Sequence, residues 1–454
     1  MTSAKRRIWG WYFFDWASQP YNTLLLTFIF GPYFAQVATA EFIRRGLVEE
    51  AAKAQAQASW GLGLTLAGLT IALLSPVLGA IADGSGRRMA WIRVFSVFYI
   101  AGALGLWTLT PDMPALTQAI VLFCTGFVAM EFATAFTNAL LPSLVDEGDI
   151  GQVSGAGFAF GYLGGLIALI LVLLFLAENG ETGKTLIRLP PAFGLDPEAR
   201  EGTRFVGPFV ALWYLVFMIP FFLWVREPAR HAQRVPPGQA LLGLWASIKG
   251  LTQRPSLAAY LGSAMFYRDA LNGLYGFGGV YAALSLGWSV TAVGIFGILG
   301  AITAGIACWA GGYADRRFGP KPVITASILV LTLVCVVLVS LSRESFFGIE
   351  LAETSWLPDI TFYICGGLIG AAGGTVQSAS RTLMVRHTTP ERATEAFGLF
   401  ALSGKATSFL APALITAVTA ITGNQQIGFV PLIVLFLIGL ILLAWVKPDG
   451  ERAE

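Results

Sequence analysis

Charged residues are scarce in this sequence. Asp, Glu, Lys and Arg make up only 12% of its 454 residues, and the formal net charge is +2. A soluble globular domain carries about 25% charged residues. Here 56% of the residues are hydrophobic, the mean hydropathy is +0.69, and long uncharged runs occur at 166–177, 323–341 and 430–446. Runs of about 20 apolar residues predict membrane-spanning helices. The composition therefore excludes a soluble globular domain and indicates a polytopic membrane protein.

Residues that hold metals and nucleotides are also few. The cysteines, Cys124, Cys308, Cys335 and Cys365, lie in apolar segments without metal-ligand spacing and are interpreted as core residues. The histidines, His231 and His387, are too far apart for a metal pair, and His387 is expected to be a solvated residue at a helix end. No phosphate-binding Gly-x-x-x-x-Gly-Lys-Ser/Thr loop occurs, so ATP is not expected to drive the protein. We expect no cofactor, no metal, no nucleic-acid partner and no enzymatic activity.

Breaks at Gly, Pro and charged clusters divide the chain into twelve expected spans. They fall at roughly 10–38, 59–82, 89–110, 114–141, 153–177, 206–226, 256–285, 288–312, 321–342, 358–386, 394–420 and 428–446. The first is interpreted as a span rather than a cleaved signal, because no small-residue cleavage site follows it. The expected fold is an all-α membrane protein with an N-terminal six-helix half (1–226), a cytoplasmic linker (227–255) and a C-terminal six-helix half (256–454).

The distribution of basic residues orients these spans. More than twice as many Lys and Arg residues fall on the side that holds the N-terminus as on the other side. Cytoplasmic segments of membrane proteins carry this excess. We therefore expect both termini in the cytoplasm. The membrane is expected to be a bacterial inner membrane.

The two halves contain an internal repeat. Gly79 and Asp83, in GAIADGSGRR, recur 232 positions later as Gly311 and Asp315, in GGYADRRFGPK. A second pair of segments, SGAGFAFG from Ser154 and FGLFALSG from Phe397, matches at an offset of 243. Two halves with corresponding loops at corresponding places indicate a duplicated architecture.

The Gly-x-x-x-Asp-x-x-Gly-Arg-Arg loop and its second copy resemble the signature loops of the major facilitator superfamily. Finer motifs resemble the vacuole effluxer-like, autophagy-related branch of that superfamily. They are FDWAS from Phe14, NALLP from Asn138, VSG from Val153, GYLGG from Gly161 and QSASR from Gln377. Long outer loops at Ala40 to Ala58 and Glu178 to Phe205 are expected on the same grounds. Phe14 and Ser18 stand where the branch has Tyr and Asn, which puts substrate contacts there in doubt.

Charged residues inside the expected spans mark the candidate site. Each lies on a polar stripe with helical spacing, and polar residues in spans usually face the bundle interior or a water-filled cavity. The candidates for substrate binding or coupling are Asp15, Gln19, Asn22, Glu131, Asn138, Arg268, Asp269, Asn272, Gln377, Arg381 and Lys405. The resemblance implies that spans 1, 4, 7 and 10, which carry most of them, line a central cavity. The candidates for gating are Gly79, Asp83, Arg87, Arg88, Asp315, Arg316 and Lys321.

Two interpretations of the buried charges stay open. They pair with one another as structural or gating salt bridges, for example Asp15 or Glu131 with Arg381, or they hold a solute that carries both charges. We expect a monomeric secondary transporter, with membrane lipid around it, for a small polar or zwitterionic solute. The resemblance implies amino acids, and Asp15 and Glu131 are the candidate proton carriers. The alternatives are a lipid, sugar or amphiphilic solute, or a non-transporting receptor.

Overall fold

The computed structural model describes residues 3–180, 182–227, 236–286, 288, 290–352, 354–424 and 426–451. Residues 228–235 of the expected linker, which include His231, lie outside the described residues. Regular structure in the described part is helical except for one short hairpin, β1 (Ser345–Phe346) with β2 (Ile349–Glu350). Eleven described helical segments are long and apolar enough to span a membrane. The twelfth expected span is α11, which has 31 residues but lower hydropathy, because it carries Arg268, Asp269 and Asn272.

The chain forms two compact units whose bounds differ from the two expected halves. The first unit comprises Met1–Ile71, Arg87–Thr137 and Phe160–Pro228. The second comprises Ala72–Gly86, Asn138–Ala159 and Ala229–Glu454, so it includes two pieces of the N-terminal half of the sequence. Helices α3 and α6 each contribute residues to both units.

The first unit is built around α1, α4, α5 and α8. Its helices are α1 (Ser3–Pro20), the π-helix η1 (Tyr21–Phe28), α2 (Phe30–Arg44), the start of α3 (Glu49–Ser85), α4 (Arg88–Gly105), α5 (Leu116–Asn138), the later part of α6 (Ile150–Phe175), α7 (Glu201–Arg204), α8 (Val206–Phe217) and α9 (Ile219–Trp224). Helix α8 packs on α4 and α1. Buried tyrosines join these helices. The rings of Tyr99 on α4 and Tyr214 on α8 stack 3.9 Å apart, and Tyr21 of η1 donates to the carbonyl of Phe123 on α5.

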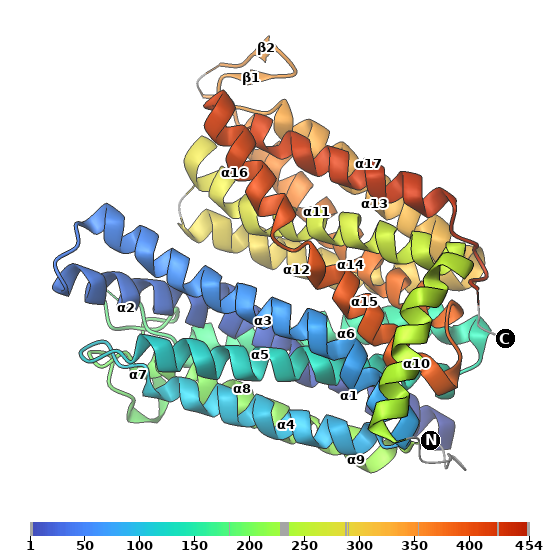
Figure 1. The fold of residues 1–454 in the computed structure, drawn as a ribbon. Coiled ribbons are helices and arrows are strands. Elements are labelled where there is room, and N and C mark those ends of the chain that lie inside the picture. Colours follow the sequence, from blue (N-terminus) through green and yellow to red (C-terminus); the bar gives the residue numbers. More distant parts are fainter. Residues whose placement is uncertain are drawn as a thin grey trace. The chain divides into compact units, whose positions relative to one another are not determined.

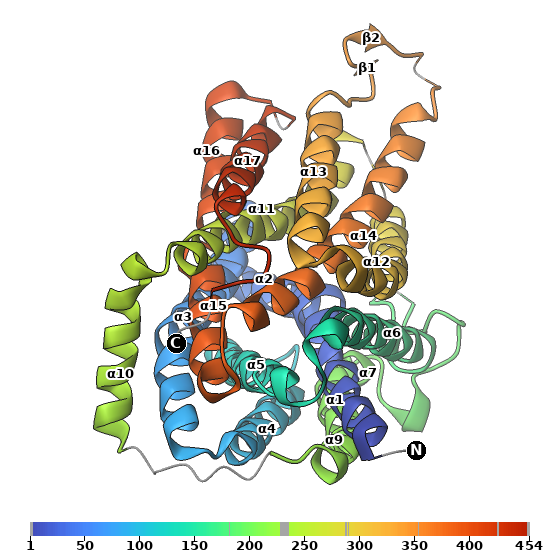
Figure 2. The ribbon, with the colours of Figure 1, turned by 90° about the vertical axis from the view of Figure 1, so that its right-hand side faces the viewer.

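The second unit is built around α11 and α14. Its helices are α10 (Pro237–Gly250), α11 (Pro255–Ser285), α12 (Val290–Phe318), α13 (Pro320–Val339), α14 (Leu357–Arg386), α15 (Ala393–Ala406), α16 (Leu410–Thr422) and α17 (Val430–Ala444). Helices α11 and α17 run side by side, and α14 packs on α12 and α13 (Figures 1 and 2). Tyr260 and Tyr267 of α11 both contact Ser380 of α14 through hydrogen bonds, so two polar rings join these helices in an apolar core.

The prediction of a long first outer loop from Ala40 to Ala58 is wrong. Helix α2 continues to Arg44 and α3 starts at Glu49, so only residues 45–48 separate them. The local sequence explains this difference, because ion pairs at i, i+4 join Glu41 to Arg45 and Glu49 to Lys53. Such pairs and a high alanine content favour helix. The segment from Glu178 to Phe205, in contrast, is largely irregular as expected.

Three expected spans are interrupted, and the sixth is divided at Met218 between α8 and α9. The first changes from α-helix to π-helix at Tyr21 and breaks at Ile29 before α2 begins. The eleventh is divided into α15 and α16 by a turn at residues 407–409. Irregular backbone inside a membrane span leaves polar groups that other residues must satisfy.

The expectation that His387 is solvated is also wrong, since only 1% of it is exposed. One ring nitrogen bonds to the carbonyl of Leu383 at 2.9 Å and the other to the Ser256 hydroxyl at 2.9 Å. Ser256 also accepts from the backbone N–H of Lys447, and Arg254 donates to the carbonyl of His387. The histidine therefore joins the end of α14 to the start of α11 and to the segment after α17.

This contact makes stability depend on pH. Burial lowers the pKa of His387 below its ordinary value of 6.5. The unfolded chain then binds a proton that the folded chain does not, so the free energy of unfolding falls as pH drops through this range. We expect thermal stability to decrease from about pH 7.5 to about pH 5.5, by at most about 1.4 kcal/mol per pH unit. Thermal melts of His387→Gln should lose this component, whereas His231→Gln, which removes the other histidine, should keep it. An unchanged pH profile in His387→Gln would contradict the assignment.

Candidate transport site and gating contacts

Arg381 is a buried charged residue of the second unit that several hydrogen bonds hold in place. Its side chain on α14 is buried, with 2% of the residue exposed. The Nε donates to the Ser154 hydroxyl at 2.9 Å, one terminal nitrogen to Asn138 Oδ1 at 3.0 Å, and the other to the Ser154 carbonyl at 2.8 Å. The guanidinium also lies over the ring of Phe158, 4.3 Å from its centre. Two predicted site residues, Asn138 and Arg381, are thus brought together, although they are 243 positions apart in sequence.

The first signature loop lies against the start of α15. Asp83 Oδ2 accepts from the backbone N–H of Glu395 at 2.9 Å, so this carboxylate caps the N-terminus of α15. Gly79, one turn earlier on α3, lies directly against the backbone of the same turn. A Cβ at Gly79 would meet the carbonyl oxygen of Thr394 at 2.5 Å. The pairing therefore needs both residue types: glycine for close approach and aspartate for the free N–H groups and the helix dipole.

The second signature loop lies against the start of α6. Asp315 is buried, with 2% exposed, and Gly151 in the first turn of α6 leaves room for its carboxylate, since a Cβ there would overlap it. Arg316 extends this contact with an ion pair to Asp149 at 3.2 Å and a hydrogen bond to Gln152 at 2.8 Å. Each loop thus places its aspartate at the N-terminus of a helix from the other half of the sequence.

The remaining gating candidates lie elsewhere. Lys321 donates to the carbonyls of Ala444 and Val446 at the end of α17, a contact within the C-terminal half. Arg88 is buried in the first unit, and Arg87 is exposed where α4 begins. The N-terminus of α4 receives the carboxylate of Glu227, which accepts from two backbone N–H groups at 3.2 Å.

Helix α11 carries two adjacent charges that face different surroundings. Arg268 lies over the ring of Phe400 at 4.4 Å and donates to its carbonyl at 2.8 Å. Asp269 is fully buried, and its Oδ2 accepts from the backbone N–H of Ala411 at 3.0 Å. This carboxylate caps α16 at the interruption between α15 and α16. Its Oδ1 has no hydrogen-bond partner among the described residues.

Three further candidates on the second unit differ in exposure. Asn272 is exposed one turn after Arg268 on α11. Gln377 is half-buried and donates to the carbonyl of Gly373 on its own helix at 3.1 Å. Lys405 is half-buried in the last turn of α15, directly before the interruption. Arg268, Asn272, Gln377 and Lys405 therefore remain candidates by position.

The first unit holds the other candidates. Asp15, Gln19 and Glu131 are half-buried on α1 and α5, and α6 lies close to α1, because a Cβ at Gly161 would meet Asp15 at 3.2 Å. Asn22 falls within the π-helix that begins at Tyr21. The i, i+7 spacing on which its inclusion rested assumes a regular α-helix, which ends at Pro20.

Several residues of these contacts were not among the predicted site residues. Ser154, Phe158 and Phe400 supply Arg381 and Arg268 with acceptors and aromatic faces. Ser154 carries a sequence signal, since it lies in the VSG motif. Phe158 and Phe400 carry none, because a phenylalanine that faces a guanidinium has the same sequence pattern as one in an apolar core.

The family model of the vacuole effluxer Atg22-like proteins matches this chain over residues 3–152 and 148–454. The chain belongs to this family. It is an integral membrane protein and a transporter of the major facilitator type, as the resemblance in the sequence predicts.

Among its relatives, an uncharacterized transporter of the major facilitator type from Bacillus subtilis, YxiO, is 25% identical over 97% of this chain and 94% of its own length. Autophagy-related protein 22 of Coccidioides immitis is 23% identical over 67% of this chain. The alignment spans about half the length of that fungal relative, 50%.

Solved structures confirm the fold. The proton:xylose symporter XylE aligns with a TM-score of 0.72 over 100% of this chain and 98% of its own, at 12% identity. The human organic anion transporter MFSD10 aligns with a TM-score of 0.71 over 98% of this chain and 100% of its own, at 14% identity. The expected major facilitator fold is therefore confirmed.

The contact of α3 with α15 predicts the effect of a larger side chain. We expect Gly79→Val to destabilise the protein by about 1–3 kcal/mol, because the added methyl groups meet backbone that cannot move aside. Gly61→Val on the same helix is the matched control, since nothing lies within 4 Å of a Cβ at Gly61. Thermal melts of the purified variants measure the difference. Equal melting temperatures would show that the close approach contributes no stability.

Proposed function

We propose that this family member moves a small zwitterionic solute, with amino acids as the first class, across the membrane by alternating access. The fungal relatives belong to a family described as vacuole effluxers, and amino-acid efflux is what this resemblance implies. We place the protein in a bacterial inner membrane, with both termini in the cytoplasm, as the excess of Lys and Arg on that side indicates.

One observation carries the mechanism: Arg381 binds Asn138 and Ser154 with all three of its nitrogens. These partners come from the opposite half of the sequence. Alternating access requires one half to move against the other around a central site. The contacts of Arg381, Asp83 and Asp315 would have to separate in that movement. With cytoplasmic termini, they would close the cytoplasmic end of the transport path.

The solute class follows from charges of both signs within the helices. Arg268 is held by Phe400 and is suited to a carboxylate, which guanidinium groups bind with paired hydrogen bonds. The acidic candidates, Asp15 and Glu131, lie on α1 and α5 of the first unit. Because the sequence has no nucleotide-binding loop, a gradient of ions or solute supplies the energy. Proton coupling through Asp15 or Glu131 is part of the proposal, because these carboxylates lie within membrane spans.

Uptake into proteoliposomes tests the proposal. Pooled radiolabelled amino acids are offered with and without an imposed pH gradient to the unmodified protein and to Asp15→Asn. We expect gradient-dependent uptake that falls by at least about tenfold in the variant, because the amide cannot take up and release a proton. Glu49→Gln is the matched control, since it removes an exposed carboxylate whose partner is Lys53.

Each outcome decides a different point. Uptake that ignores the gradient would keep the amino-acid class and make Asp15 a binding or gating residue. No uptake by folded protein would overturn the amino-acid class, and the same vesicles would then be tested with sugars, lipids and amphiphilic compounds.

A further inference from the structure

A cavity lies within the first unit, where η1 ends, α2 begins and α6 ends. Its volume is about 780 Å³. The interrupted end of the first span, Phe28 to Gln36, forms one wall. The end of α6 and the irregular segment from Glu178 to Thr203 form the others. A cavity of this size holds a small organic molecule.

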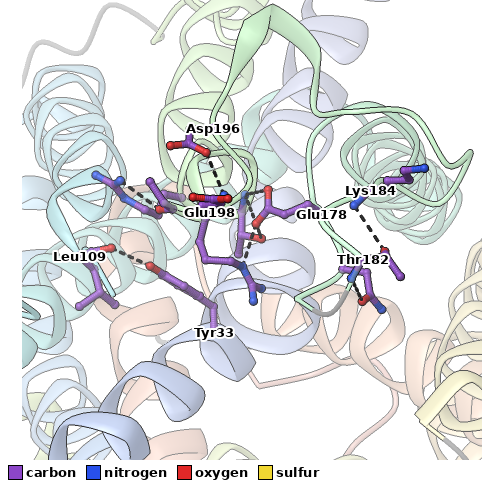
Figure 3. A network of polar contacts seen from close by, with 12 residues as sticks. Tyr33, Leu109, Glu178, Thr182, Lys184, Asp196 and Glu198 are labelled. Atoms are coloured by element: carbon purple, nitrogen blue, oxygen red, sulfur yellow. Dashed lines mark hydrogen bonds and ion pairs between the residues drawn. The ribbon is translucent and has the colours of Figure 1, made fainter. Parts of the chain in front are cut away.

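One residue that lines the cavity is Arg200, whose side chain is held by its neighbours. Arg200 Nε donates to Glu178 Oε1 at 2.9 Å, and the guanidinium lies over the ring of Tyr33. The Glu178 side chain is fully buried and also accepts from the backbone N–H and the hydroxyl of Thr203. Figure 3 shows Glu178 at the centre of this network, close to Tyr33. Gly202 makes the approach possible, because a Cβ there would overlap the carboxylate.

The two terminal nitrogens of Arg200 have a different environment. Within the described part of the chain, neither makes a hydrogen bond, and the side chain is 22% exposed in a residue that lines the cavity. A guanidinium with two adjacent free amino groups is the group that binds carboxylates in a bidentate manner. Lys184 and Arg188, both exposed, line the same cavity and add positive charge.

Among the described residues that line the cavity, the acidic one is Glu178, and its oxygens accept hydrogen bonds from Arg200 and Thr203. Within this described lining, an ammonium group would therefore meet positive charge without a free carboxylate. Phe28, Ile29, Pro32 and Leu173 supply apolar walls beside the cationic groups.

From this geometry we infer that the cavity is a binding site for an organic carboxylate with an apolar body, and that Arg200 receives the carboxylate. The site rejects amines of the same shape. It is separate from the polar residues assigned to transport and does not rest on the proposed function, since binding here is measured without transport.

Three matched probes test the site: phenylbutanoate, phenylbutanol and phenylbutylamine, which share one body and differ in charge. Each is titrated calorimetrically into the full-length protein in nanodiscs, and empty nanodiscs correct for partition into lipid. We expect the carboxylate to bind more tightly than the alcohol, and the amine to bind most weakly. The affinity for the carboxylate should fall with added salt.

Two variants locate the binding. Arg200→Lys keeps the charge and a partner for Glu178 but lacks the planar fork, and should weaken phenylbutanoate binding by about tenfold. Lys184→Gln with Arg188→Asn removes the charge at the mouth and should weaken it several-fold. Asparagine suits position 188 because the backbone there is left-handed, with φ of 62°. Lys53→Gln, an exposed cation of the same unit that does not line the cavity, should leave binding unchanged.

Two results would overturn the inference. One is that the alcohol or the amine binds the unmodified protein as tightly as the carboxylate. The other is that both variants bind phenylbutanoate as the unmodified protein does, which would place the probe elsewhere. Thermal melts show whether each variant is folded, and if one is not, the order of the three probes on the unmodified protein still decides. Failure of amino-acid uptake leaves this result unaffected.

Discussion

A buried guanidinium requires hydrogen-bond acceptors, and this requirement at Arg381 organises the second unit. A hydrogen bond to a charged group contributes about 1.5–3 kcal/mol, so a lost acceptor at a buried guanidinium is costly. Asn138 and Ser154 fill the need, which explains why the Asn138–Ala159 segment groups with α14 and not with its neighbours in sequence. Any movement that separates Asn138 from α14 must supply other acceptors. Water or another polar group would do so.

Each of the two repeated loops places an aspartate at the N-terminus of a helix. Asp83 meets the N-terminus of α15, and Asp315 meets that of α6. Free N–H groups and the helix dipole favour a carboxylate at both places. The two contacts differ in strength, however, because Asp83 accepts a backbone hydrogen bond, whereas neither oxygen of Asp315 has a hydrogen-bond partner among the described residues. The Asp315 contact therefore lacks the backbone hydrogen bond that Asp83 accepts, and an ion pair of Arg316 with Asp149 lies beside it.

The sequence predicted the helical class, the spans and the repeat, because apolar length and the offset of 232 positions are visible in one dimension. It also placed Asn138 and Arg381 among the candidate site residues, since each lies on a polar stripe within a span, but it did not predict their contact. It did not predict the burial of His387, whose partners Ser256 and Lys447 are distant in sequence. Neighbouring charges such as Arg386 made this histidine look solvated. Contacts that form only when distant segments meet leave no local pattern.

The interruptions within spans were also not visible in the local sequence. One of them explains why Asp269 is buried. Hydropathy treats residues 394–420 as one span, yet α15 ends at Ala406 and α16 begins at Leu410. In lipid, the N–H groups freed at the start of α16 need acceptors. Asp269 supplies one through Ala411, so this carboxylate has a structural task that its position on a polar stripe did not reveal. Arg268, its neighbour, turns to Phe400 instead. Two adjacent charges on one helix thus have separate partners: a helix terminus for Asp269 and an aromatic residue for Arg268.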